Sequence, residues 1–236
     1  MSNTLIRIRQ LTIGYDDRTL YDGVDFDINE GECIMLCGAN GSGKTTLMKS
    51  LEKSCEGADY EAVMIPTRIP KLKGFTVREF ITTGCYRKSD IAGRLSRKDR
   101  ESLESAMETL GLSHLAERDI STLSDGEFQK AGIAVALVRR ASLIMLDEPT
   151  AFLDAENRRA VLSTLKELCT TDTEDIKPAV IFSTHDLYEG MKVADKVIAL
   201  GADGKVHVSS LGHGSGSAQM EAAVASIFKN RCQEVD

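Results

Sequence analysis

The order of apolar and polar positions divides the chain into three kinds of segment. Apolar and polar residues alternate over positions 6–9 and 24–28, which is typical of half-exposed strands, and we predict an antiparallel pair there. Continuous apolar runs at 33–37 (CIMLC), 143–147 (LIMLD) and 179–183 (AVIFS) predict strands that helices cover on both faces. Helical spacing of apolar residues is found at Leu103, Met107 and Leu110; at Ile133, Ala134, Leu137 and Val138; and at Val161, Leu162, Leu165 and Leu168.

These elements together predict a single α/β domain with a mainly parallel sheet and an N-terminal antiparallel β flank. We expect residues 1–67 and 141–210 to form its core. Residues 68–140 contain helical patterns and no convincing strand, so they predict a helical subdomain inserted into that core. Residues 211–236 begin as a Gly/Ser-rich tail, and they end in a short predicted helix with Met220, Val224, Ile227 and Phe228 on its apolar face.

Length and charge narrow the possible functions. A chain of 236 residues, 42% of them hydrophobic, can bury one sizeable core. Acidic residues outnumber basic ones by 36 to 29, which speaks against a nucleic-acid partner. The sequence has no apolar run of the roughly 20 residues that span a bilayer, and its N-terminus lacks a signal-peptide core. We therefore expect a cytosolic protein that meets a membrane only through a partner.

We assign no function to the cysteines or to a basic stretch at 87–100. The cysteines, at positions 33, 37, 55, 85, 169 and 232, form no C-x-x-C pair and no metal-ligand cluster, and we expect small buried thiols at Cys33 and Cys37. The basic stretch at 87–100 is either a docking surface or a solvated helix face, and we interpret it as the solvated face.

A glycine-rich loop stands between the apolar run at 33–37 and a helical pattern. Its sequence, GANGSGKTT at 38–46, fits the phosphate-binding pattern G-x-x-x-x-G-K-[ST]. The glycines allow successive N–H groups to converge on one point, and the helix N-terminus adds its positive end. We expect Lys44 to contact the β and γ phosphates, Thr45 to offer an oxygen to Mg²⁺, and Thr46 to donate to the α phosphate. A structural glycine-rich turn would explain the glycines but not this Lys-Thr pair.

The whole loop is accordingly assigned to nucleotide binding. Its residues are Gly38, Ala39, Asn40, Gly41, Ser42, Gly43, Lys44, Thr45 and Thr46.

Two adjacent carboxylates, Asp147 and Glu148, end the apolar run at 143–147. At the carboxyl edge of a parallel sheet they would face the same crevice as the phosphate loop. We expect Asp147 to hold Mg²⁺, commonly through water, and Glu148 to polarise the attacking water. Helix capping or plain solvation is the alternative for an isolated acidic pair, but a third buried strand ending in STHD favours the functional interpretation.

With these motifs in this order, the chain resembles the ATP-binding subunit of an ABC transporter over nearly its whole length. The segment 38–46 matches the Walker A loop, 143–148 the Walker B strand, 151–154 the D-loop, and His185 the switch histidine. The resemblance implies a P-loop NTPase core of ABC type that binds ATP and Mg²⁺. It also implies that Tyr15 stacks on adenine, that His185 holds the γ-phosphate and the attacking water, and that Asp154 carries information across a dimer interface. For Tyr15 alone, a ring packed within a strand pair is the alternative.

The segment LSDGE at 123–127 resembles the signature sequence of that family, usually written LSGGQ. Ser124 and Glu127 also form an S-x-x-E capping box, which predicts a helix start at this point. In the family, this helix start faces the γ-phosphate held by a second copy, so Ser124 and Gly126 would contact it in an ATP-bound homodimer.

The chain departs from the family pattern at two places. Asp125 and Glu127 bring carboxylates close to the expected triphosphate, which requires them to turn away or to pair, for instance Glu127 with Lys130 one turn on. Thr67 stands where the family has the Q-loop glutamine, and its side chain is too short to reach a metal equally far. The stretch between Lys44 and Thr67 also lacks the length for the family's peripheral hairpin.

The resemblance further implies separate, multi-span permease partners and a cytoplasmic position at the inner face of the cell membrane. The segments 75–87 and 149–154 resemble subunits that drive import of iron-siderophore, haem or cobalamin, and the cargo would never touch this subunit. A soluble ATPase of iron-sulfur cluster assembly is the alternative, favoured by Glu127 and disfavoured by Phe152. An exporter or lipoprotein-release ATPase is a third. Chromosome-maintenance ATPases and tandem translation factors do not fit the short spacing and single nucleotide site.

Overall fold

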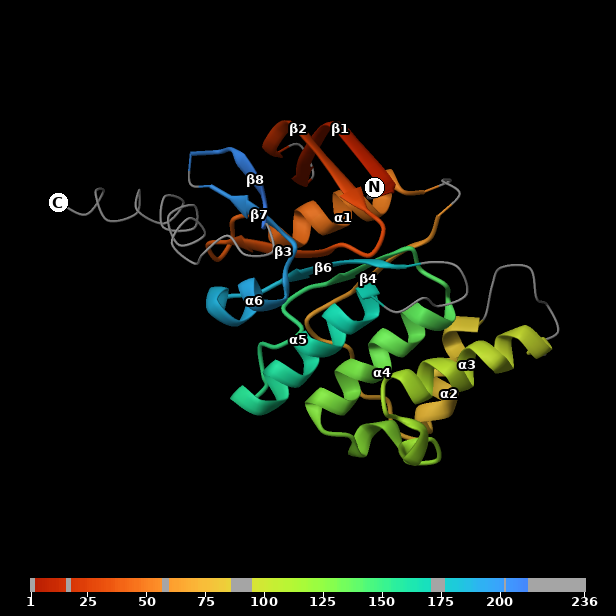
Figure 1. The fold of residues 1–236 in the computed structure, drawn as a ribbon. Helices are drawn as coiled ribbons and strands as arrows, with labels where there is room; N and C mark the ends of the chain where they lie inside the picture. Colours follow the sequence, from red (N-terminus) through yellow and green to blue (C-terminus); the bar gives the residue numbers. More distant parts are fainter. Residues whose placement is uncertain are drawn as a thin grey trace.

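The computed structural model describes residues 3–15, 18–56, 60–85, 95–170, 177–201 and 203–211. Two sheets form the framework (Figure 1). The smaller is an antiparallel pair of β1 (Thr4–Tyr15) and β2 (Arg18–Asn29). The larger has the strand order β4-β5-β6-β3-β7-β8, in which the first five run parallel and the last is antiparallel. Its strands are β3 (Cys33–Gly38), β4 (Ala62–Ile65), β5 (Leu143–Leu146), β6 (Ala179–Ser183), β7 (Lys196–Leu200) and β8 (Val206–Ser210).

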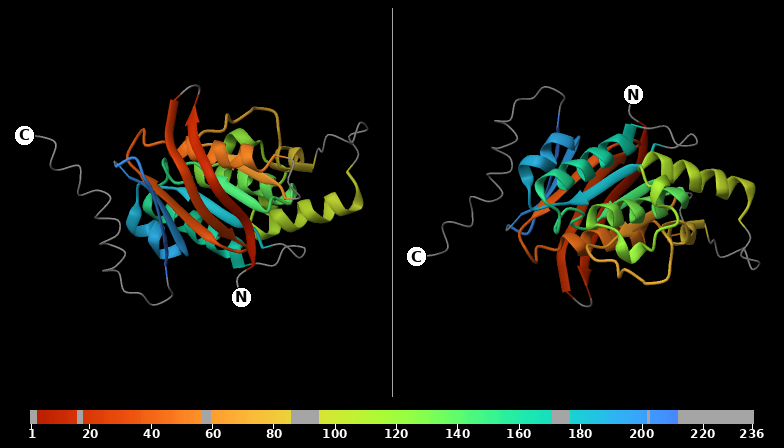
Figure 2. Two further views of the ribbon diagram at one scale, coloured as in Figure 1. Left: turned by 90° about the horizontal axis from the view of Figure 1, so that it is seen from above. Right: turned by 90° about the horizontal axis from the view of Figure 1, so that it is seen from below.

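Helices cover the sheet on both sides. The α-helices of the described ranges are α1 (Lys44–Ser54), α2 (Val77–Thr82), α3 (Arg97–Thr109), α4 (Asp125–Val138), α5 (Ala155–Thr170) and α6 (Leu187–Val193). Short 3-10 turns lie at Thr83–Cys85, Ser113–Leu115 and Ile120–Thr122. Figure 1 shows α1 between the sheet and the β1-β2 pair, whereas α4, α5 and α6 lie beyond the opposite face. Both views of Figure 2 agree, with β1 and β2 crossing the upper face and α4 and α5 seen from below.

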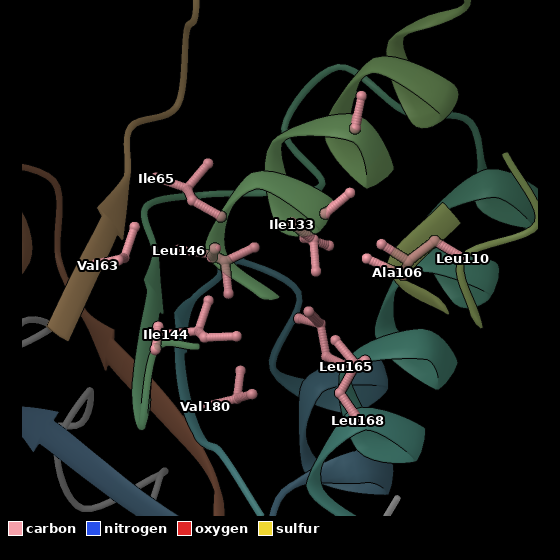
Figure 3. Close-up of a cluster of buried hydrophobic side chains, with 14 of the residues drawn as sticks. Val63, Ile65, Ala106, Leu110, Ile133, Ile144, Leu146, Leu165, Leu168 and Val180 are labelled. Carbon is pink, nitrogen blue, oxygen red and sulfur yellow. The ribbon is translucent and has the colours of Figure 1, made fainter. Parts of the chain in front are cut away.

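The two faces of the sheet belong to two different hydrophobic cores. On β5, Leu143 and Met145 pack with α1 and the β1-β2 pair, while Ile144 and Leu146 pack with the helical side. Figure 3 shows the second core, where Ile144 and Val180 of the sheet face apolar residues of α4 and α5. Successive residues of each strand therefore support different layers, which explains why the strands are apolar without interruption.

The predicted α/β architecture is confirmed, including the mainly parallel sheet and the antiparallel flank. Cys33 and Cys37 are fully buried thiols, as expected. A hydrogen bond with Cys169 and burial raise the pKa of Cys33, and burial raises the pKa of Cys37 to about 11. Among the described helices, none is both long and apolar enough to cross a bilayer.

Two sequence predictions concern residues that lie largely or wholly outside the described ranges. Most of the basic stretch at 87–100 lies outside the described residues, which resume at position 95. The predicted C-terminal helix, with Met220 and Phe228 on its face, also lies outside them.

Candidate nucleotide-binding site

The glycine-rich loop joins β3 to α1 and depends on two left-handed glycines. Gly41 has φ of 76° and Gly43 has φ of 101°. A Cβ at Gly43 would stand 2.8 Å from Leu20 Cδ1, so backbone angle and space both favour glycine there. Gly43 is also the N-cap of α1, a helix that begins with no side-chain cap and no acidic residue in its first turn. The N–H groups of that turn are therefore available to an anion.

Lys44 directs its charge back into the loop. Its side chain is buried, and its Nζ donates to the carbonyls of Gly38 at 3.1 Å and Ala39 at 3.3 Å. The tyrosine hydroxyl of Tyr21, on β2, donates to the carbonyl of Ser42 at 2.9 Å and so braces the loop from outside. We did not identify Tyr21 from the sequence, where it is simply one apolar position of a strand.

Thr45 and Asp147 come together although they are far apart in the chain. Thr45 Oγ1 donates to Asp147 Oδ2 at 2.6 Å, and Ser183 Oγ donates to Asp147 Oδ1 at 2.8 Å. Hydroxyl and carboxylate oxygens are the ligands that Mg²⁺ accepts in proteins, so this pair fits the expected ion. Asp147 is only 7% exposed, which keeps its carboxylate fixed between the two hydroxyl groups.

Glu148 has a strained backbone conformation and lies beside Lys44 of the phosphate loop. Its φ is 49°, a left-handed value that side chains other than glycine rarely adopt. Its backbone N–H donates to Ser183 Oγ at 2.8 Å, which holds the residue in this conformation. The carboxylate Oε1 lies 2.6 Å from His185 Nε2 and 4.0 Å from Lys44 Nζ. Strain of this kind is often retained where it serves a reaction.

The same hydroxyl of Ser183 therefore contacts both adjacent acidic residues. It accepts from the N–H of Glu148 and donates to Asp147, while its own side chain is completely buried on β6. Ser183 was not among the site residues predicted from the sequence. The only signal there was its place at the end of a buried strand, two residues before His185.

Tyr15 lies at the end of β1, where it pairs with Arg18 of β2. Its side chain is 49% exposed, so it is not packed within the strand pair. Arg18 Nη1 donates to its hydroxyl at 3.4 Å. The tyrosine is thus accessible from solvent.

The signature segment forms the start of α4, with Ser124 as N-cap. The Glu127 N–H donates to Ser124 Oγ at 3.3 Å, and Glu127 Oε2 accepts from both the N–H and the hydroxyl of Ser124 at 2.8 Å. These bonds to Ser124 hold the pKa of Glu127 below its usual value. The predicted capping box is therefore present, and Glu127 uses its carboxylate there instead of pairing with Lys130. Gly126 is buried against Asn157 of α5.

Asp125 finds its partner on the other side of a groove. Its Oδ1 accepts from Lys71 Nζ at 2.8 Å. Lys71 also donates to the carbonyl of Leu123 at 2.8 Å, and its Nζ lies 5.3 Å from the ring centre of Phe128. Both acidic departures from the family pattern are therefore paired, one locally and one through Lys71.

The groove beside Lys71 has a volume of about 530 Å³. It is lined by residues 67–71, by Asp125, Phe128 and Gln129 of α4, and by residues between 148 and 153. Thr67, two residues beyond β4, lines it, and Glu148 lines it too. Gln129 adds a 9% exposed amide whose Nε2 has no hydrogen-bond partner among the described residues. The Arg68 guanidinium stands 4.8 Å above the Phe152 ring at the opposite wall.

Asp154 ends the D-loop and immediately precedes α5. Its carboxylate accepts from the backbone N–H of Asn157 at 2.8 Å and from Asn157 Nδ2 at 2.9 Å. These hydrogen bonds hold the pKa of Asp154 below its usual range. Asn157 therefore contacts Asp154 and also packs beside Gly126, which links the D-loop to the start of α4 within one copy.

The structure thus gathers one half of the predicted site. Lys44, Thr45, Asp147, Glu148 and His185 are joined by hydrogen bonds or ionic contacts around the phosphate loop. Ser124 and Gly126 are not part of this set, and their contacts are with Glu127 and Asn157.

Comparison with known proteins agrees with this geometry. Residues 21–151 match the ABC transporter family. The iron(3+)-hydroxamate import ATP-binding protein of Bacillus subtilis (strain 168) is 30% identical over 81% of this chain and 77% of its own length. An aliphatic sulfonates import ATP-binding protein of Nocardia farcinica is 35% identical over 83% of this chain and 77% of its own.

A solved structure of a metal-chelate type ABC transporter in an inward-facing conformation superposes with a TM-score of 0.81. Its identity to this chain is 24%, over 96% of this chain and 90% of that one. The chain belongs to the ABC transporter family and is one of its ATP-binding, ATP-hydrolysing subunits.

Proposed function

We propose that the chain powers import of an iron-siderophore, haem or cobalamin-like cargo through a separate membrane permease. The observation that carries the ATP-hydrolysing role is the position of Glu148, whose carboxylate contacts His185 and lies beside Lys44 at the phosphate loop. The importing role is supported by similarity to a relative named for iron(3+)-hydroxamate import.

ATP binding is assigned to the loop and to Tyr15. The loop residues Gly38 to Thr46 would surround the phosphates with main-chain N–H groups, and Lys44 would supply a positive charge. Stacking of adenine on the accessible Tyr15 ring would contribute about 1–3 kcal/mol, as base stacking on aromatic rings does elsewhere. Thr45 and Asp147 would hold Mg²⁺, which adds positive charge at the β and γ phosphates.

Hydrolysis is assigned to Glu148 and His185. Glu148 would orient the attacking water and accept its proton, because its carboxylate is held at the mouth of the loop. His185, which contacts that carboxylate, would keep water and γ-phosphate in line. Phosphoryl transfer requires mostly positioning and charge stabilisation, which fits a site built from fixed hydrogen bonds.

The second half of the site is assigned to another copy of the chain. Ser124 and Gly126 lie at a helix start whose first-turn N–H groups have no acceptor inside the helix. In a two-fold dimer each such start would face the triphosphate held by the other copy, and Asp154 would lie near the interface. ATP binding would then close the dimer, and hydrolysis at Glu148 would reopen it.

The permease is expected at the groove beside residues 67–71. A groove of about 530 Å³ would have room for part of a helix, and the exposed Phe152 ring would offer an apolar contact. Docking there would place this subunit at the cytoplasmic face of the cell membrane. Thr67 would transmit movement with a side chain shorter than glutamine.

The cargo itself is not contacted by this subunit in the proposal. Relatives named for iron(3+)-hydroxamate and for aliphatic sulfonates have similar identities to this chain, so the choice of an iron chelate follows the resemblance of segments 75–87 and 149–154.

The test is an affinity purification of the tagged Glu148→Gln variant with ATP and Mg²⁺. Solubilised membranes and the soluble extract are processed separately, and the Lys44→Ala variant, which should not bind ATP, serves as the matched control. Recovery of a multi-span permease by Glu148→Gln, and not by Lys44→Ala, would support the transporter and identify the transport system.

Recovery of soluble cluster-assembly proteins alone would overturn the importing role. It would favour the iron-sulfur cluster alternative, in which the same nucleotide site serves a soluble complex.

A further inference from the structure

The start of α4 carries a charge that opposes its proposed role. Asp125 places a carboxylate in the first helical turn, where the proposed dimer brings the triphosphate of the other copy. Glu127, the second carboxylate in this turn, is already held by the Ser124 N–H and hydroxyl. Like charges repel most where water is excluded, so the charge of Asp125 must be neutralised before a triphosphate can lie beside it.

Lys71, from the segment between β4 and α2, neutralises Asp125. Its Nζ donates to Asp125 Oδ1 and to the carbonyl of Leu123, both at 2.8 Å. One ammonium group is thereby hydrogen-bonded to both neighbours of the N-cap Ser124, namely Leu123 and Asp125. The Nζ of Lys71 also lies 5.3 Å from the centre of the Phe128 ring, which is a third contact around the start of α4.

Stability of the single chain gives little reason for this arrangement. The Asp125 side chain is 60% exposed and that of Lys71 is 29% exposed. Ion pairs with such an exposed partner contribute little to folding, because both charges are solvated without each other. Their effect on the potential at a nearby anion site is larger, since closure of a dimer removes the water that screens them.

We propose that Lys71 is a positioning residue for ATP in the dimer, because it neutralises Asp125 and holds it at the groove side of α4. The inference rests on the proposed function, in which the start of α4 meets the triphosphate of a second copy. Lys71 itself does not need to touch ATP. The role is specific to this chain's signature sequence, in which aspartate replaces the family's glycine.

The experiment measures ATP-dependent dimerisation of purified full-length protein by sedimentation. All variants carry Glu148→Gln so that ATP persists, and the ATP concentration for half-maximal dimer is the readout. Lys71→Ala should raise that concentration by about tenfold, since it exposes an unpaired charge to the anion. Adding Asp125→Asn to Lys71→Ala should restore it to within about threefold of the parent, because the pair acts through one charge.

Two controls separate charge from folding. Lys73→Ala removes an exposed lysine from the same loop and should change the half-maximal concentration by less than about twofold. Binding of a fluorescent ATP analogue to the dilute monomer should stay the same in every variant, because the phosphate loop is untouched. The defect of Lys71→Ala should also shrink as salt rises, since salt screens the repulsion.

The outcomes are distinguishable. If the parent forms an ATP-dependent dimer and Lys71→Ala leaves it unchanged, the role of Lys71 is overturned and the proposed function stands. A defect that Asp125→Asn does not relieve would likewise overturn it, because Lys71 would then act only through its bond to Leu123. Absence of an ATP-dependent dimer in the parent would overturn the proposed dimer, and the role of Lys71 with it.

Discussion

Helices α1 and α4 begin in opposite ways. Helix α1 starts after Gly43 with no side-chain cap and no acidic residue in its first turn. Helix α4 starts after Ser124 with a complete capping box and two carboxylates in its first turn. Both starts reach the surface, since Asn40 and Gly41 are exposed before α1, as Ser124 and Asp125 are at α4.

The difference indicates two grades of anion site. An uncapped helix start lined by glycines has its N–H groups free for phosphate, so we expect α1 to bind ATP in the isolated chain. At α4, Glu127 already accepts two bonds from Ser124, and Asp125 needs Lys71. The start of α4 should therefore bind phosphate only when the triphosphate is held by the phosphate loop of a second copy. The following changes test this contrast, beginning with the largest expected effect.

Glu148→Gln should lower kcat for ATP hydrolysis by about 10³-fold, because the amide cannot accept the proton of the attacking water. ATP affinity of the monomer should remain the same, since α1 and its loop are unchanged. Steady-state phosphate release and nucleotide titration measure the two quantities. Glu108→Gln, on the exposed side of α3, is the control for loss of one charge. Normal turnover in Glu148→Gln would remove this residue from the base role.

Alanine at Gly43 and at Gly126 should give opposite results. At Gly43, φ of 101° and the nearby Leu20 side chain should cost about 1–3 kcal/mol of unfolding free energy, and ATP affinity of the monomer should fall with it. At Gly126, a Cβ would meet Asn157 Oδ1 at an ordinary 3.6 Å. Its unfolding free energy should stay the same or rise by up to about 1 kcal/mol, as for Gly-to-Ala changes in helices.

Chemical denaturation and nucleotide titration of both variants make this comparison. Gly126→Ala should affect only ATP-dependent dimerisation. Loss of monomer ATP affinity in Gly126→Ala would show that the two helix starts are not independent.

Ser183→Ala should lower kcat by about tenfold and change the ATP KM by less than about twofold, because it frees both Asp147 and the N–H of Glu148 from a buried partner. Ser183→Thr retains the hydroxyl and should recover part of the rate. Ser142→Ala, at another buried serine beside β5, is the matched control. Equal losses of kcat in both alanine variants would indicate a general packing defect.

Ser124→Ala should lower the unfolding free energy by about 1 kcal/mol at neutral pH, since it removes an N-cap. Hydrogen bonds with Ser124 hold the pKa of Glu127 below its ordinary value in the native protein, so the ionised carboxylate adds stability that is present above the ordinary pKa and lost as pH falls through the native pKa. The difference between wild type and Ser124→Ala should therefore shrink as pH falls through the native pKa of Glu127. Urea denaturation across this range measures it, and Glu127→Gln should show no such dependence.

Local patterns in the sequence predicted the elements that depend on neighbours along the chain. The capping box at Ser124 and Glu127 and the three buried strands at 33–37, 143–147 and 179–183 are all present. The expected pairing of Glu127 with Lys130 is not seen, because the cap offers Glu127 two donors that have no acceptor in the helix. We did not identify β8, since most of its side chains are exposed.

Contacts between distant segments could not be predicted from spacing. Lys71 and Asp125 are 54 positions apart, and Ser183 and Asp147 are 36 apart. The sheet order brings the second pair together, since β5 and β6 are neighbours. Packing of residues 67–71 along α4 brings the first pair together, and no motif in the chain indicates that packing.

The alternation of β5 between two hydrophobic cores has a consequence for local unfolding. Helix α1 packs in one core and α4 in the other, so we expect the amides of the two helices to exchange in different cooperative units. Opening that exposes α4 to hydrogen exchange can occur while α1 remains protected. A chain of this design can loosen the helix that another subunit must contact without releasing the loop that holds its own nucleotide.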